Sequence, residues 1–101
     1  MLVVREIMYC KPGKVRPMLE KFKAMSKLSE KHGMPKMRIM TDVSAERYWT
    51  LVAEMEVENM DEFMKMGEGM DAAAQKEFEA LMKDYHDLVD HGRREIYKLE
   101  G

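Results

Sequence analysis

Histidine is the side chain most often used as a general base near neutral pH, and two of the three histidines in this chain lie close together. His86 and His91 are five positions apart, with Asp84, Asp87 and Asp90 around them. This spacing does not bring two imidazoles onto one helix face, as a zinc pair four residues apart would require. We therefore predict no metal site, expect an acidic helix end with histidines near its dipole, and retain His86 as the candidate catalytic base.

A second group of residues could form the walls of a site for a flat apolar molecule. Tyr48 and Trp49 are adjacent at the start of an expected strand, whereas Phe63, Met66 and Tyr85 belong to expected helices. Aromatic and thioether side chains suit such a pocket, and a small apolar or aromatic ligand is the predicted partner. The alternative is that these residues only fill the core, which is also the role we expect for most of the 13 methionines.

The single cysteine, Cys10, cannot form an intrachain disulfide, and we interpret it as a small buried apolar residue. Arg5 and Glu54 interrupt otherwise apolar strands, where an unpaired charge would be costly to bury. Because their strands are expected to be neighbours at the centre of the sheet, the two residues are predicted to pair with each other or across a dimer. The alternative is a role in orienting a substrate.

Charge and hydropathy exclude several classes of protein. The chain has 101 residues, with 17 basic and 19 acidic side chains that nearly cancel. Nucleic-acid binding would require basic residues gathered on one face, which is not observed. The apolar run 2–4 stops at Arg5, far short of an export signal or a membrane span. We predict a cytoplasmic protein with no nucleic-acid or membrane partner and no cofactor.

Hydrophobic periodicity predicts strands and helices in alternation. Strands are expected over residues 2–10, 34–42, 47–57 and 94–99. A long helix should follow Gly13 and close at Gly33, a short helix should begin at the Asn59/Glu62 capping box, and a last helix should run from about residue 71 to a cap at Gly92. Gly67 and Gly69 separate the last two helices, either as the rim of a pocket or as a simple turn.

This order, β-α-β-β-α-β, defines an α+β ferredoxin-like domain over residues 1–101, with a four-stranded antiparallel sheet and helices on one face only. In the first strand both alternating sets of side chains are mostly apolar, which indicates burial on both faces of the sheet. A second copy of the chain is the simplest cover for the face without helices. A homodimer is therefore predicted.

Residues 5–14, which read R-E-I-M-Y-C-K-P-G-K and run into an amphipathic helix, resemble the start of NIPSNAP-like and antibiotic-biosynthesis-monooxygenase-like members of the dimeric α+β barrel superfamily. The expected order of elements fits that superfamily along the whole chain. The resemblance implies a homodimer with a pocket between sheet and helices. The haem-degrading members use an asparagine on the first strand, and residues 2–10 contain none.

Two functions remain open at the level of sequence. One is a small-molecule enzyme of the cofactor-independent monooxygenase type, in which a dry apolar pocket and one base act on an electron-rich substrate. The other is a non-catalytic ligand-binding or structural dimer module. Fold resemblance alone does not choose between them.

Overall fold

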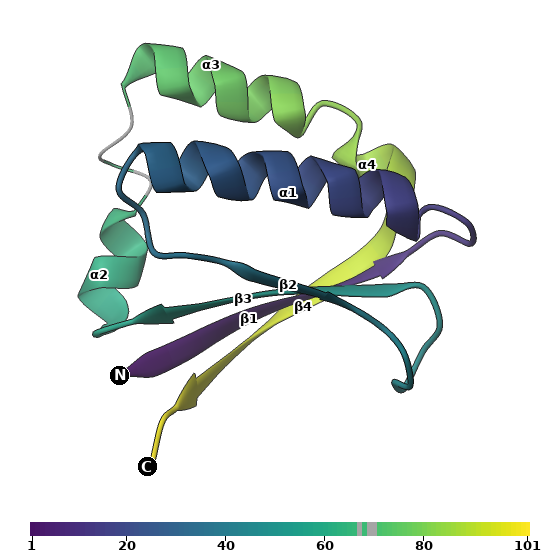
Figure 1. Cartoon of the computed structure of the whole chain (residues 1–101), viewed down its shortest axis with the longest axis horizontal. Helices are drawn as coiled ribbons and strands as arrows, with labels where there is room; N and C mark the ends of the chain where they lie inside the picture. The colour runs from purple at the N-terminus through teal and green to yellow at the C-terminus, as the bar shows by residue number, and fades with distance from the viewer. Residues whose placement is uncertain (67, 69–70) are drawn as a thin grey trace.

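The helices lie together on one face of a four-stranded antiparallel sheet, as Figure 1 shows from the side. The structure, a computed structural model, describes residues 1–66, 68 and 71–101. Its elements are β1 (Leu2–Cys10), α1 (Val15–Lys31), β2 (Arg38–Thr41), β3 (Thr50–Val57), α2 (Met60–Lys65), α3 (Ala72–Leu81), α4 (Tyr85–Leu88) and β4 (Val89–Lys98). The strand order is β2-β3-β1-β4. The predicted α+β ferredoxin-like fold is confirmed.

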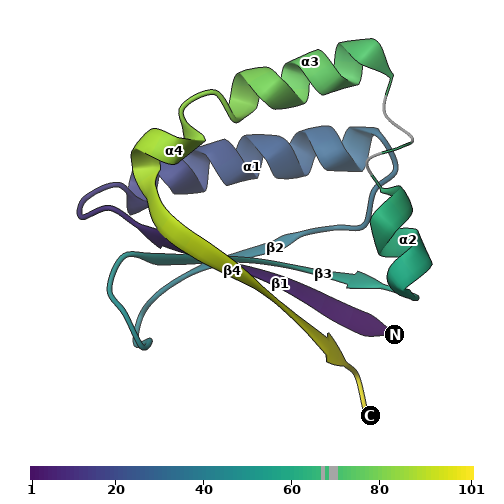
Figure 2. The same ribbon diagram turned by 180° about the vertical axis from the view of Figure 1, so that it is seen from behind.

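The central strand, β1, pairs with β3 on one side and β4 on the other, and its side chains alternate between the two faces. Met8 and Cys10 point toward the helices and join the main core cluster. Ile7 and Tyr9 point to the opposite side, which we call the open face because no described helix covers it (Figure 2). Both sets are buried, as the sequence predicted.

The long helix α1 forms because its apolar residues recur every three or four positions and face the sheet. Met18, Phe22 and Met25 are buried there. The helix ends where predicted. Gly33 takes a φ of +75°, and the amides of Gly33 and Met34 donate to the carbonyls of Glu30 and Ser29 at 3.1 and 3.0 Å. This pattern is a Schellman cap, which glycine favours because it adopts the left-handed conformation without strain.

The capping box before α2 is also confirmed. Asn59 Oδ1 accepts a hydrogen bond from the Glu62 amide at 2.8 Å, and the Glu62 carboxylate accepts one from the Glu58 amide at 2.6 Å. The first bond satisfies an amide of the first helical turn that has no partner within the helix, and the second binds the amide of the residue just before Asn59 rather than that of Asn59 itself. The predicted break at Gly67 and Gly69 falls on positions outside the described residues.

The prediction of one helix from residue 71 to a cap at Gly92 is wrong. The helix α3 ends at Leu81, where Lys21 donates to the Leu81 carbonyl and pairs with Asp84. A single turn, α4, follows, and β4 already begins at Val89. Gly92 lies inside this strand opposite Met8 of β1, so it caps no helix. The residues from Val89 onward have a local pattern that also suits the end of a helix. They form a strand instead, because pairing with the buried strand β1 outweighs that local preference.

The second and third strands are shorter than predicted. The strand β3 begins at Thr50 rather than at residue 47, since Trp49 has a φ of +62°, outside the extended range. The Thr50 amide donates to Asp42 Oδ1 at 2.9 Å, and the Thr50 hydroxyl donates to the Arg47 carbonyl at 2.8 Å. These bonds hold residues 42–49 as a loop between β2 and β3. Figure 1 shows this loop extending to the open-face side of the sheet.

Candidate functional site

The open face contains a cavity of about 360 Å³ between the β2–β3 loop and the strands β1, β3 and β4, which we call the open-face pocket. Its lining combines apolar side chains, arginines and carboxylates: Ile7, Tyr9, Met40 and Val52; Arg5, Arg47 and Arg93; and Glu46, Glu54 and Glu95. The strands supply most of this lining, so the pocket is largely preformed by the sheet. An apolar floor with a few charged groups around it is typical of a small-molecule site.

Tyr9 is the aromatic residue in the lining of the pocket, and it is buried, with 6% of its surface exposed. The guanidinium carbon of Arg47 lies 4.7 Å from its ring centroid, and that of Arg93 lies 5.9 Å away. The His91 ring is 4.8 Å from the Tyr9 ring, tilted by 49°. One aromatic ring therefore gathers two cations and an imidazole at one end of the pocket.

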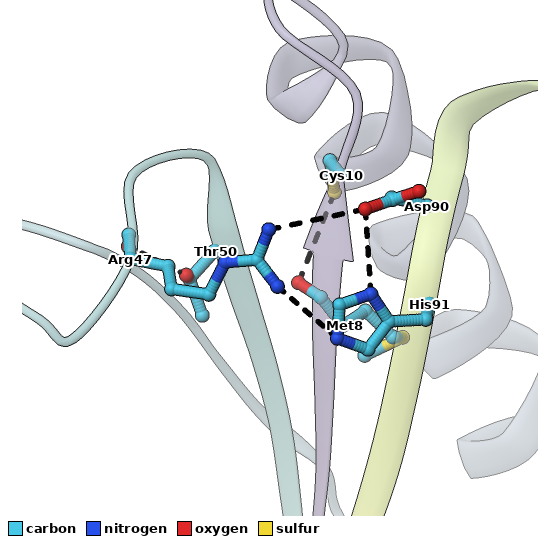
Figure 3. A network of polar contacts seen from close by, with 6 residues as sticks. All are labelled: Met8, Cys10, Arg47, Thr50, Asp90 and His91. Atoms are coloured by element: carbon cyan, nitrogen blue, oxygen red, sulfur yellow. Dashed lines mark hydrogen bonds and ion pairs between the residues drawn. The ribbon is translucent and has the colours of Figure 1, made fainter.

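A polar network connects the β2–β3 loop to β4 over this ring. Figure 3 shows Arg47 reaching toward β4, where His91 and Asp90 face it. Arg47 Nη1 lies 3.1 Å from His91 Nε2, and His91 Nδ1 lies 3.3 Å from Asp90 Oδ2. A guanidinium can only donate hydrogen bonds, so Nε2 must accept. The tautomer that satisfies both contacts carries its proton on Nδ1, which donates to Asp90.

A second charged group lies on β1, β2 and β3. Glu54 is buried and accepts from Arg5 Nε at 2.8 Å, while Arg38 contacts its other oxygen. Burial alone would raise the pKa of Glu54, but the hydrogen bonds and charges of Arg5 and Arg38 outweigh it and hold that pKa below its ordinary value. The predicted pairing of Arg5 with Glu54 is confirmed, and Glu54 is ionised at neutral pH.

The sequence-predicted site residues occur as three separate pairs. Tyr48 and Trp49 line a different hollow, of about 380 Å³, with Thr41 and Asp42 of the same hairpin. Phe63 and Met66 pack at the other end of β3, against a small core cluster that contains Val57.

The third pair is on α4. Tyr85 packs against the main core cluster, and burial first of all raises its pKa. His86 is exposed, and its ring meets the Tyr85 ring edge-on at 5.2 Å. The open-face pocket contains none of these six residues, and the hollow beside Tyr48 and Trp49 contains none of the other four.

Cys10 is buried beneath α1 and α4, on the helix side of the sheet. Burial raises the pKa of its thiol, and the nearby charge of Asp42 raises it further. A protonated, enclosed thiol is a poor nucleophile, in agreement with its interpretation as an apolar residue. Within the described residues, no three side chains of His, Cys, Asp and Glu gather as metal ligands would.

Sequence reasoning missed the principal residues of the open-face pocket. His91 was assigned to a helix end, and Arg47 to a strand, so neither was expected beside Tyr9. The sequence feature that indicates a site on this face is the apolar character of Ile7 and Tyr9, because apolar side chains there predict that another molecule or chain covers the open face. Only the pairing of Tyr9 with His91 across β1 and β4 reveals which polar groups surround it.

Comparison with solved structures finds the same fold in proteins of very different sequence. An uncharacterised NIPSNAP domain protein from Burkholderia xenovorans superposes with a TM-score of 0.80 at 14% identity, over 100% of this chain and 96% of that one. A NIPSNAP family protein from Agrobacterium tumefaciens gives 0.80 at 10% identity, over 98% and 92% of the two chains. An antibiotic biosynthesis monooxygenase gives 0.71 at 12% identity over the full length of both.

The chain matches no protein-family model and no curated protein at the level of sequence. The structural matches confirm the predicted resemblance, since this chain has the fold shared by NIPSNAP domain proteins and antibiotic-biosynthesis-monooxygenase-like proteins. No described helix is both long and apolar enough to cross a membrane.

Proposed function

We propose that the protein is a homodimeric small-molecule enzyme of the cofactor-independent monooxygenase type, which binds a flat, acidic aromatic substrate in the open-face pocket. The observation that supports this best is the pocket itself, with its apolar floor and its arginines. The floor suits an aromatic body, and the guanidinium groups suit an ionised hydroxyl or carboxylate. The fold likeness to proteins named as monooxygenases supplies the reaction type.

The second copy has two roles in this proposal. No helix among the described residues lies over the open face, and Met40 and Tyr97 are substantially exposed there. The charges of this face are nearly balanced rather than of one sign, so two copies can meet without strong net repulsion. The charged residues are Arg5, Arg38, Arg47 and Arg93 against Glu46, Glu54, Glu56, Asp90 and Glu95. A second copy would also exclude water from the pocket, which strengthens every electrostatic interaction inside it.

Oligomeric state can be tested by sedimentation velocity with a matched pair of variants. Met40→Asp adds a charge to the open face, whereas Met64→Asp adds the same charge to an exposed position on α2. We expect a dimer that Met40→Asp weakens at least about tenfold, equal to about 1.4 kcal/mol, and that Met64→Asp leaves intact. A wild-type monomer at micromolar concentration would contradict the proposal.

Binding and reaction can be tested with naphthol as the probe. Val52→Phe fills the pocket floor and should abolish naphthol binding measured by calorimetry, while His86→Gln, on α4, should not. Oxygenation would convert naphthol and one O₂ into naphthoquinone and water, with equal consumption of the two reactants. Binding without oxygen consumption would favour the alternative, a non-catalytic ligand-binding module. If naphthol, naphthoate and a hydroxyquinone all fail to bind, the pocket assignment is wrong.

A further inference from the structure

We infer that His91 is the base that accepts the proton of a phenolic or enolic ligand in the open-face pocket, and that Arg47 blocks this base until such a ligand arrives. The inference rests on the proposed function, because it requires the ligand to occupy that pocket. It assigns the proton acceptor to β4 rather than to His86 on α4. It also assigns Arg47 two successive partners, which are His91 in the ligand-free protein and the ligand oxygen after binding.

The imidazole of His91 lies close to the open-face pocket. Tyr9 and Arg47 both line the pocket, and both contact His91, so the ring lies next to the lining, covered by these two residues rather than part of it. The His86 ring instead meets the Tyr85 ring on α4, and His86 is not part of the lining of this pocket. His91 is the histidine that a ligand on the Tyr9 floor would meet.

The contacts of the His91 ring determine which of its two nitrogens carries the proton. Arg47 can only donate, so in this arrangement Nε2 of His91 offers its lone pair to Arg47 and Nδ1 carries the proton. Asp90 Oδ2, 3.3 Å from Nδ1, accepts a hydrogen bond from Nδ1–H and would stabilise the imidazolium formed later. A carboxylate that orients the Nδ1–H of histidine and leaves Nε2 as the base is the arrangement found in acid–base dyads. The charged groups around the ring are Asp90, Arg47 and, across Tyr9, Arg93.

Arg47 is the group that blocks Nε2 of His91. Arg47 Nη1 occupies the lone pair that a base needs, at 3.1 Å, and its contact with Asp90 is long, at 3.9 Å. About half of the Arg47 side chain is exposed, and its backbone belongs to a loop rather than to a strand. A phenolic oxygen in the pocket would accept a hydrogen bond from this guanidinium in place of Nε2, and the attraction would grow as the oxygen loses its proton, because a full negative charge attracts the guanidinium more strongly than a neutral imidazole does.

The proton transfer follows from this exchange. The ligand O–H bond breaks, its proton forms a bond with Nε2, and its electron pair stays on the oxygen. The resulting imidazolium pairs with Asp90, and the oxyanion pairs with Arg47. No oxidant is needed for this step. It produces the electron-rich anion with which dioxygen would react under the proposed function.

Two measurements test the inference. In the ligand-free protein, ¹⁵N NMR of the imidazole should show His91 with its proton on Nδ1, and a ring protonated on Nε2 would overturn the blocking role of Arg47. With a nitrophenol as the probe, visible absorbance reports the phenolate directly. Bound to the wild type, its phenolate-to-phenol ratio should be at least about tenfold higher than free in solution at the same pH, equivalent to one pKa unit.

The variants separate this inference from the pocket assignment. We expect His91→Gln to abolish the tenfold enrichment of phenolate while nitroanisole, the methyl ether without an acidic proton, binds as tightly as to the wild type. His86→Gln is the matched control and should leave both unchanged. If nitroanisole binds but His91→Gln keeps the enrichment, the base is wrong and the pocket stands. If neither probe binds the wild type, the pocket is refuted and the base with it.

Discussion

The group formed by Arg5, Glu54 and Arg38 allows a graded test of how burial controls the worth of an ion pair. The Glu54 side chain is only 8% exposed, whereas Arg5 is 37% and Arg38 is 58% exposed. Arg5 gives Glu54 both Nε and Nη2 at 2.8 Å, but Arg38 approaches from the more exposed strand β2. The two arginines therefore share one carboxylate from different environments.

Replacing Arg5 should cost much more than replacing Arg38. Breaking a buried pair costs about 3 to 5 kcal/mol when the remaining charge is isolated. Here Arg38 stays beside Glu54 and water reaches both arginines, so we expect Arg5→Gln to cost about 2 kcal/mol, near the value of a charged hydrogen bond. The exposed pair lost in Arg38→Gln should be worth about 0 to 1 kcal/mol. Urea unfolding at about pH 7 measures both.

The pH dependence gives an independent check. The pKa of Glu54 is lower in the folded protein than its ordinary value of 4.5, so the unfolded chain takes up the proton first as the pH falls. The stabilisation from Glu54 is therefore fully present above that value and is lost progressively below it. The cost of Arg5→Gln should shrink as urea unfolding is repeated below about pH 4.5. Equal costs for Arg5→Gln and Arg38→Gln, or a cost independent of pH, would refute the reasoning.

Three further substitutions test the packing. A methyl group at Gly92 would lie 3.0 Å from the Ile7 carbonyl oxygen, which β1 holds in place, so Gly92→Ala should lower the unfolding free energy by about 1 to 3 kcal/mol; an unchanged urea midpoint would contradict that register. Met18 is fully buried under the sheet, whereas Leu81 is only partly buried. Met18→Ala should therefore lower the unfolding free energy by about 3 to 5 kcal/mol, and Leu81→Ala by about 1 to 2 kcal/mol. If thermal unfolding shows Leu81→Ala to be the less stable variant, this assignment of the core is wrong.

The local features of the chain were predictable because they depend on neighbours in the sequence. The Schellman cap at Gly33 and the Asn59 capping box involve residues within a few positions of each other, and both were predicted. The pair of Arg5 with Glu54 is distant in sequence, but the strand order predicted it. A buried charge requires a partner, and two central strands placed these residues side by side.

The second half of the chain could not be assigned from its own pattern. The residues between Leu81 and Gly92 suit a continuing helix, but Lys21 satisfies the end of α3 and β1 provides a buried strand for pairing. Hydrogen bonds and burial across the sheet then outweigh local preference. His91 consequently becomes a strand residue on the open face.

The sequence by itself determined the order of strands and helices, the one-sided arrangement of the helices and the pairing of the central charges. Only the tertiary structure decided where the functional candidates gather. Tyr9, Arg47 and His91 come from three segments that meet solely because β1 pairs with β4 and the β2–β3 loop turns under the open face. Periodicity specifies which face a side chain occupies, but the register between strands fixes its neighbours, and that register is a property of the whole folded chain.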